Sequence, residues 1–218
     1  MSEARLIPAR RPERRVLDGR HARLEPLSAA HGAALFRALG GVEAAGLWTH
    51  MADGLFPERS DFDAAMARRA AGEDPLFFAI APQGAEAAGI ASLMRIDAGN
   101  GVIEVGGIVF GAPLAQSAAA TEAIYLLAGY VFDTLGYRRF EWKCDDRNAA
   151  SKRAAARFGF RSEGLFRQHM IVKGANRDTA WFSMLDREWP ARKAAFEAWL
   201  APENFDARGR QKRPLARD

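Results

Sequence analysis

The sequence predicts an α/β protein of the α+β kind, with a single mixed, mostly antiparallel sheet of about seven strands flanked by helices. Three observations support this fold class. Helical patterns come early, adjacent strand patterns follow, and the last part alternates strand and helix before two closing strands. The chain has no internal repeat and no long linker. Of its 218 residues, 49% are hydrophobic, which is enough for one sizeable core.

The first third of the chain predicts two short strands and then three helices. Ser28 is a candidate N-cap for the first helix, and Gly40 with Gly41 ends it. The expected strands cover residues 16–20 and 22–27, and the expected helices cover 28–39, about 42–50, and 61–71.

An antiparallel meander is expected next. A Pro-Gln-Gly turn joins its first two strands, and the stretch from Asp97 to Gly101 is a strong turn signal before the third. The expected strands cover residues 76–81, 88–96 and 102–110.

A long helix over residues 117–135 follows, with Gly136 as its candidate C-cap. Its apolar residues recur at spacings of three, four and seven, which indicates one buried stripe. These residues are Ile124, Leu127, Ala128, Val131 and Leu135. The remaining elements are a strand over 137–144, a helix over 149–158, strands over 161–172 and 178–186, and a helix over 188–200.

The net charge of +4 comes from the ends of the chain. Residues 1–15 hold five arginines and two glutamates, and residues 204–218 hold five basic residues and two aspartates. We expect two disordered, solvated basic tails around a domain over 16–203. The alternative is that a tail docks on nucleic acid or on the ribosome.

Composition also bounds the setting. No window is apolar enough to span a membrane, and no secretory signal is evident. Cys144 is the only cysteine, so an internal disulfide is impossible and a reducing, cytoplasmic location fits. The four histidines lie far apart in sequence, without the spacing of a zinc site. We therefore expect no metal.

Two features indicate a ligand site. Gly106 and Gly107 interrupt a strand, which is typical of a bulge or of close approach by a ligand. The helix start at 117–120 is rich in small residues, so its unpaired N–H groups could hold a phosphate. Any alanine-rich helix start has the same appearance, so the simpler interpretation stays open.

Four short motifs occur in order along the second half of the chain. They are Ala120-Thr121-Glu122-Ala123, Leu135-Gly136-Tyr137-Arg138, Asn148 followed by Ser151, and Gly159-Phe160. Together they resemble the GNAT acetyltransferases, and the Asn–Ser pair resembles the ribosomal-protein N-terminal acetyltransferase branch. The resemblance implies acetyl-CoA as co-substrate and acetyl transfer to a primary amine, either a protein N-terminus or a small molecule, by direct attack in a ternary complex.

The resemblance also implies a set of residues that bind acetyl-CoA. They are Ile108, Val109, Phe110, Gln116, Ser117, Ala118, Ala119, Ala120, Thr121, Asn148, Ser151 and Arg153. The phosphate loop departs from the family pattern, because Ala115 stands where Gln or Arg is expected and Ala118 replaces a glycine. Asn148 is equally explained as an N-cap. Whether the altered loop holds CoA tightly is left open.

Four residues are candidates for the chemistry. The attacking amine must lose a proton, and Glu104 and Glu141 are candidate bases, with His169 as a third. Each glutamate is equally explained as a cross-strand ion-pair partner. Ala155 occupies the place of the usual family tyrosine, so the resemblance gives the acid role to Ser151, whose hydroxyl shares a helix face with apolar residues.

The acceptor side is expected in the helical segment 42–66, where Trp48, His50 and Phe56 are candidate substrate-binding residues. The alternative for the aromatic residues is a place in the core. Two other functions stay open: a non-catalytic acyl-CoA-binding module, and a ribosome- or nucleic-acid-associated binder that uses the basic tails. A homodimer is also left open.

Overall fold

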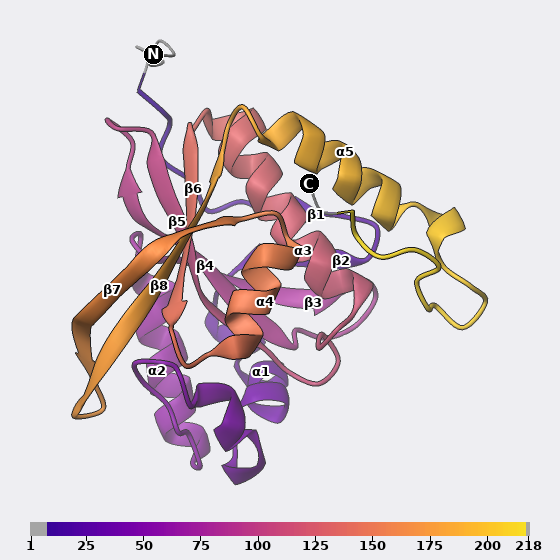
Figure 1. The fold of residues 1–218 in the computed structure, drawn as a ribbon. Helices are drawn as coiled ribbons and strands as arrows, with labels where there is room; N and C mark the ends of the chain where they lie inside the picture. The colour runs from indigo at the N-terminus through magenta and orange to yellow at the C-terminus, as the bar shows by residue number, and fades with distance from the viewer. Residues whose placement is uncertain (1–7, 217–218) are drawn as a thin grey trace.

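The computed structural model describes residues 8–216, which form one open eight-stranded sheet with helices on both faces (Figure 1). The strand order is β1-β2-β3-β4-β5-β6-β8-β7. All neighbouring strands are antiparallel except β5 and β6, which are parallel. The strands are β1 (Leu17–Asp18), β2 (Ala22–Pro26), β3 (Leu76–Pro82), β4 (Gly89–Asp97), β5 (Val102–Phe110), β6 (Arg139–Asp145), β7 (Arg161–Val172) and β8 (Ala175–Leu185). The fold class is confirmed, with eight strands where about seven were expected.

Within the described part of the chain, five α-helices and four shorter helical segments surround the sheet. The α-helices are α1 (Gly32–Leu39), α2 (Arg59–Ala71), α3 (Ala118–Gly129), α4 (Ala149–Arg157) and α5 (Trp189–Leu200). The shorter segments are η1 (Ala29–His31), η2 (Val42–Trp48), η3 (Tyr130–Leu135) and η4 (Pro202–Asn204). The expected helix over 42–50 is thus a 3₁₀ segment, and the last turns of the long helix over 117–135 are a π-helix that ends at Gly136 in the left-handed region.

Two hydrophobic cores lie on opposite faces of the sheet. In Figure 1, α3 and α5 pack on one face, and α1 and α2 cover the other. Successive residues of β3 serve both cores: Phe78 and Ile80 face α3, whereas Phe77 and Ala79 face α2. This explains why β3 reads as a continuous apolar run, since a strand covered on both faces needs no polar alternation.

The closing hairpin is tighter than the sequence suggested. Val172 pairs with Ala175, so only Lys173 and Gly174 form the turn, with φ of 51° and 75°. Two successive positive φ angles fit a two-residue turn that matches the twist of the strands. The β8 strand therefore begins at residue 175 and not at 178, and the β7–β8 hairpin projects beyond the rest of the sheet (Figure 1).

The described parts of both terminal segments contact the domain, although most of their side chains are exposed to solvent. The N–H groups of Ala9 and Arg10 donate to the carbonyls of Ala98 and Leu135, at 3.0 and 2.9 Å. Near the other end, Leu215 is only 3% exposed and joins the core on the α3 face. Apolar contacts and backbone hydrogen bonds, which composition does not reveal, hold these basic segments. Residues 1–7 and 217–218 of the predicted tails lie outside the described part.

Two searches concern only the described residues. Between residues 8 and 216, no helix combines the length and the apolar composition needed to cross a bilayer. Within the same range, no three His, Cys, Asp or Glu side chains are grouped as ligands for a metal ion.

Candidate active site

A cleft opens where the two parallel strands of the sheet separate. The pairing of β5 with β6 runs from Val102 opposite Arg139 to Val105 opposite Trp142 and stops there. Beyond this point a cleft of about 1260 Å³ is lined by the rest of both strands and by the starts of α3 and α4. Within the described part of the chain, no strand pairs with β5 beyond Val105 on this side.

The double glycine of β5 forms a bulge at the point of separation. The register of β5 with β4 shifts between Ile90 and Ser92, and Ser92 Oγ donates to the Gly106 carbonyl at 3.0 Å. Gly107 has φ of 58°, and a Cβ there would lie 2.8 Å from the ring of Phe77. Both conditions favour glycine. The bulge turns β5 away from β6, and both glycines line the cleft.

One end of the cleft, the α3 end, consists of residues at the start of α3. These are Gln116, Ser117, Ala118, Ala120 and Thr121. Ser117 caps the helix, because its Oγ accepts from the N–H of Ala120 at 3.0 Å. The N–H groups of Ala118 and Ala119 belong to the first turn, where the helix itself provides no acceptor. The side chain of Ala119 is buried in the core, so the only group of this residue that can contact acetyl-CoA, as predicted, is its backbone N–H.

Glu122 fixes this helix start against the sheet. Its carboxylate accepts from the backbone N–H groups of Arg20, His21 and Ala22 at 3.1, 2.5 and 2.7 Å. Three hydrogen bonds to one buried carboxylate are strong, since each is charge-assisted. The turn before β2 and the start of α3 are therefore held together.

The start of α4 places Ser151 at the cleft wall. Asn148 is the N-cap, and its Oδ1 accepts from the N–H of Ser151 at 2.9 Å. Ser151 Oγ accepts from Trp142 Nε1 at 2.9 Å, so the hydroxyl hydrogen is available for another acceptor. The predicted inward orientation of Ser151 is confirmed. Burial raises the pKa of the neighbouring Cys144 thiol, which therefore stays protonated at neutral pH.

The two arginines of α4 differ in position. Arg153 is exposed and lies outside the cleft lining, whereas Arg157 belongs to it. The Arg157 guanidinium donates to Thr121 Oγ1 at 3.0 Å and lies 5.0 Å from the ring centroid of Trp199. Both arginines are compatible with the helix pattern, but only the last turn of α4 reaches α3, so Arg157 and not the predicted Arg153 lies beside this end of the cleft.

The polar face of β6 is both ion-paired and part of the cleft. Lys143 Nζ lies 3.0 Å from Glu104 Oε2 and 2.7 Å from Glu141 Oε2. Arg95 Nε is also 3.0 Å from Glu104, and Arg139 Nε is 2.7 Å from Glu141. Glu104 lines the cleft and Glu141 does not. Burial raises the pKa of the Glu104 carboxyl above its ordinary value, against the opposing effects of Lys143 and Arg95.

The other end of the cleft, the hairpin end, lies beside the β7–β8 hairpin. Its polar and sulfur-bearing residues include His50, Met51, Asp145, His169 and Arg177. His50 Nδ1 lies 3.7 Å from Asp145 Oδ2, and His169 Nδ1 lies 3.1 Å from Thr179 Oγ1. A hydrogen bond from Arg147 is the main cause that lowers the pKa of Asp145 to about 2. A second, polar cavity of about 830 Å³ shares Asp145 with this end.

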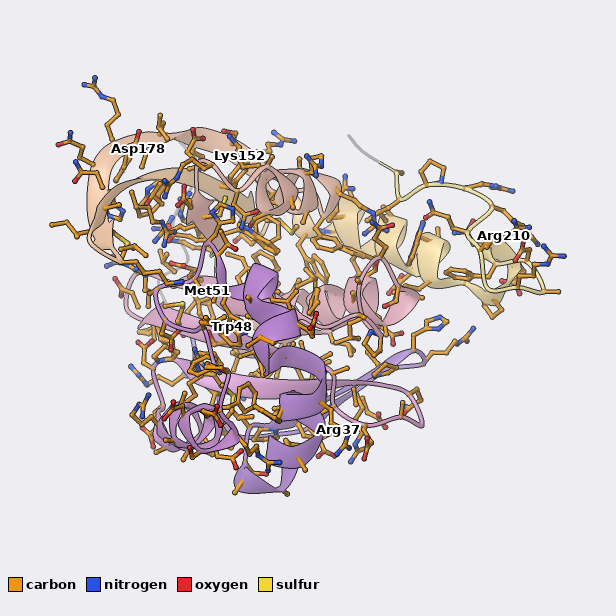
Figure 2. The ribbon with its side chains drawn as sticks, turned by 90° about the horizontal axis from the view of Figure 1, so that it is seen from below. Arg37, Trp48, Met51, Lys152, Asp178 and Arg210 are labelled. Atoms are coloured by element: carbon orange, nitrogen blue, oxygen red, sulfur yellow. The ribbon has the colours of Figure 1, made fainter. Side chains whose placement is uncertain are left out.

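Two of the three predicted acceptor-side residues are core residues. Trp48 is 1% exposed, its Nε1 donates to the Leu39 carbonyl at 2.8 Å, and its ring packs edge-on against Phe56. Both lie outside the cleft lining, as does the Val109 side chain, which joins the core on the α1 and α2 face. Of the three, only His50 reaches the cleft, since it follows η2. Figure 2 labels Trp48 and the following Met51 between α1–α2 and the β7–β8 hairpin.

Several lining residues were missed by sequence reasoning. They are Phe77, Met94, Arg95, Cys144, Asp145, Trp199, Phe205, Arg210 and Gln211. Those on strands carry no local signal, and two of them, Phe77 and Cys144, also belong to the cores. Phe205, Arg210 and Gln211 lie in the segment 204–218, whose composition suggested a solvated tail.

Comparison with known proteins identifies the family. A model of the Acetyltransferase (GNAT) domain matches residues 21–161, which is more than half of the chain. The match begins just before β2 and ends at the first residue of β7, so it includes the cleft between β5 and β6. The chain therefore belongs to the GNAT acetyltransferase family.

Individual relatives agree with this assignment. A GCN5-related N-acetyltransferase from Brucella melitensis is 52% identical, with a TM-score of 0.93 over 95% of both chains. A probable GNAT-family acetyltransferase from Chromobacterium violaceum is 39% identical, with a TM-score of 0.79 over 87% of this chain and 98% of that one. The uncharacterized N-acetyltransferase p20 of Bacillus licheniformis is 31% identical over 118 residues, which are 54% of this chain and 66% of the relative.

The ribosomal-protein branch is a distant structural neighbour. A putative ribosomal-protein-serine acetyltransferase from Vibrio cholerae is 16% identical, with a TM-score of 0.66 over 78% of this chain and 97% of that one. An acetyl transferase from Salmonella typhimurium, described as modifying the N-terminal serine of ribosomal protein L7/L12, is 18% identical, with a TM-score of 0.68. At these identities the likeness shows the fold alone.

Proposed function

We propose that this protein transfers an acetyl group from acetyl-CoA to a primary amine by direct attack in a ternary complex. The observation that carries the proposal is the end of the β5–β6 pairing at Val105 and Trp142, which opens the cleft between two parallel strands. The acceptor is either the N-terminus of a protein or a small-molecule amine.

The α3 end and the free edge of β5 suit the thioester substrate. An extended pantetheine arm can add to the unpaired backbone of Ile108, Val109 and Phe110 as an extra strand would, which requires no particular side chain at Val109. The first-turn N–H groups of α3 favour phosphate, and the small side chains of Ala118 and Ala120 let it approach the backbone. The residues present therefore fit acetyl-CoA.

Glu104 is the base that the geometry favours. An alkyl ammonium has a pKa of about 10, so the acceptor must lose a proton before its nitrogen can attack the thioester carbonyl. Glu104 faces the cleft, and its raised pKa brings its basicity closer to neutrality. Glu141 lies outside the cleft between Lys143 and Arg139, which favours a structural role.

Ser151 is suited to the leaving group. As the new N–C bond forms and the C–S bond breaks, negative charge develops on sulfur. The Ser151 hydroxyl accepts from Trp142 and keeps its hydrogen for such an anion. Because a thiolate is already a good leaving group, this hydrogen bond contributes modestly to the rate.

The test is acetyl transfer itself. Purified protein is incubated with acetyl-CoA and a panel of primary amines, both short peptides with free N-termini and small alkyl amines. Release of free thiol is measured, and the mass of the products is determined by mass spectrometry. The expected result is one thiol released for each acetyl group of 42 Da gained by an amine. Saturable binding of acetyl-CoA without any amine-dependent thiol release contradicts the proposal.

That contradictory outcome supports the second candidate, a non-catalytic acyl-CoA-binding module. Its motivation is the replacement of the expected loop residues by Ala115 and Ala118 and of the usual acid by Ala155. A binder that acts through basic tails has less support, because the described arginines 10, 14 and 15 contact Thr134, Ala70 and Tyr130 of the same chain. We propose a cytoplasmic location, because the single cysteine fits a reducing compartment.

A further inference from the structure

The segment after α5, residues 201–216, closes the α3 end of the cleft. Phe205, Gly209, Arg210 and Gln211 of this segment are among the lining residues, together with Trp199 at the end of α5. They lie outside residues 21–161, which match the family model. This wall of the cleft therefore lies outside the part of the chain that the family model matches.

The segment is an ordered structure. Asn204 is 8% exposed; its Nδ2 donates to the Trp199 carbonyl at 2.9 Å, and its Oδ1 accepts from the N–H of Arg213 at 3.0 Å. Phe205 and Gln211 form an antiparallel bridge, and Trp199 Nε1 donates to Gln211 Oε1 at 2.9 Å. Leu215 then anchors the segment in the core. A loop of this kind can hold side chains in fixed positions.

The segment also brings charge to a place where the α3 loop has none. Ala115 and Ala118 are neutral, and residues 115–120 include no Lys or Arg, so this loop has no charged side chain with which to bind phosphate. Across the cleft, Arg157 is held by Thr121 and by the ring of Trp199. Arg210 Nε lies 2.9 Å from Asp206, and its side chain is 70% exposed, so most of its donors face solvent. The α3 loop has no charged side chain, and the guanidinium groups of Arg157 and Arg210 lie beside this end of the cleft.

We propose that residues 201–216 form the nucleotide-binding end of the acetyl-CoA site, with Arg210 and Arg157 supplying the positive charge that the α3 loop lacks. The proposal rests on the proposed function for the identity of the thioester. It makes this segment specificity-determining: it distinguishes a thioester that carries a phosphorylated nucleotide from one that ends at pantetheine. Figure 2 shows Arg210 far from Asp178 of β8, at the opposite end of the molecule.

The test compares two thioesters and three single variants. Acetyl-CoA and acetyl-pantetheine share the reacting group, but only acetyl-CoA carries the phosphates. Arg210→Gln and Arg157→Gln are measured beside Arg208→Gln, an exposed arginine of the same loop that does not line the cleft. Truncation of the segment is avoided because it would remove Leu215 from the core.

The expected result is a selective loss. Arg210→Gln raises the KM for acetyl-CoA by about threefold to tenfold, as the loss of one exposed charge contact implies. Arg157→Gln raises it further, while kcat and the KM for acetyl-pantetheine stay unchanged and Arg208→Gln has no effect. The effect of Arg210→Gln declines with added salt.

Three results overturn the inference: no change in KM for Arg210→Gln, an equal change for both thioesters, or the same change for Arg208→Gln. Calorimetric titration with CoA itself measures the same affinity without turnover. An acetyl-CoA that binds but is not consumed therefore contradicts the proposed function, whereas a Kd for CoA that Arg210→Gln leaves unchanged contradicts the role of this segment.

Discussion

The two ends of the cleft are built in different ways. At the α3 end, a capped helix start presents backbone N–H groups, and Ser117 and Glu122 fix that backbone through local and long-range hydrogen bonds. At the hairpin end, single polar side chains such as His50 and His169 come from loops and strands far apart in sequence. Backbone sites leave local sequence signals, whereas side-chain sites depend on which segments the fold brings together.

The Glu104→Gln and Glu141→Gln variants sharpen this comparison most. Each removes one charge from the same Lys143-centred network, but only Glu104 lines the cleft. We expect Glu104→Gln to lower kcat/KM on the order of 100-fold near pH 7, as the loss of a general base does, and to remove the acidic limb of the pH profile. Glu141→Gln serves as the matched control and should lower activity by less than about threefold.

Rates for both variants are measured from pH 5 to 9, with circular dichroism to verify folding. If Glu141→Gln loses more activity than Glu104→Gln, the assignment of the base is reversed. If neither variant changes the pH profile, an ordered water or another group takes the proton.

The Ser151→Ala variant tests the proposed role of the Ser151 hydroxyl, which lies at the cleft wall at the start of α4. We expect kcat to fall by roughly tenfold with the KM for acetyl-CoA unchanged, because the hydroxyl acts only when charge develops on sulfur. The variant also leaves Trp142 Nε1 without its acceptor, which costs about 1 kcal/mol of stability. Ser162→Ala, at an exposed position of β7, is the control. A rise in KM at constant kcat would show that Ser151 only binds the ground state.

His50→Gln tests the hairpin end, with Phe56→Leu as the core counterpart. His50 lines the cleft beside Asp145, so we expect its loss to raise the KM for the amine about threefold to tenfold and to leave the KM for acetyl-CoA unchanged. Phe56 packs in the core, so Phe56→Leu should lower stability by about 1 kcal/mol without changing either KM. A change in the amine KM for Phe56→Leu would restore that residue to the acceptor site.

The smallest expected effect concerns acid stability at the hairpin end. The pKa of Asp145 is about 2 in the folded protein, below its unfolded value of about 4. Its stabilising contribution is therefore present above pH 4 and lost as the pH falls toward 2. Urea unfolding of the wild type and of Asp145→Asn between pH 6 and 2 should differ most at pH 6, by on the order of 1–2 kcal/mol, and converge near pH 2. Parallel curves would mean that Arg147 does not stabilise the ionised form.

Regular, strongly patterned elements could be predicted from the sequence, and so could the backbone part of the site. The strands over 102–110 and 161–172 have the expected bounds, and Ser151 faces inward as its helical spacing indicated. The sequence did not reveal which aromatic and basic residues line the cleft. Trp48 and Arg153 have the same local patterns as lining residues, and only the packing of η2 and the reach of α4 exclude them.

The C-terminal wall was missed for a similar reason. Its basic composition is typical of a solvated tail, and the contacts that order it involve single residues such as Asn204 and Leu215. Such contacts have no periodicity, so no sequence pattern indicates them.

The central claim is that the start of α3 binds the phosphates of acetyl-CoA. It is tested most directly by calorimetric titration of acetyl-CoA into the wild type, Ala118→Glu and the control Ala112→Glu, an exposed residue outside the cleft. The helix dipole stabilises a glutamate in the first turn of α3, so the substitution leaves the helix intact. A loss of binding would therefore not result from unfolding of the helix. The account predicts saturable binding by the wild type and by Ala112→Glu, and an affinity at least about 100-fold weaker for Ala118→Glu, since the added carboxylate repels phosphate. Equal affinity in all three proteins would contradict it.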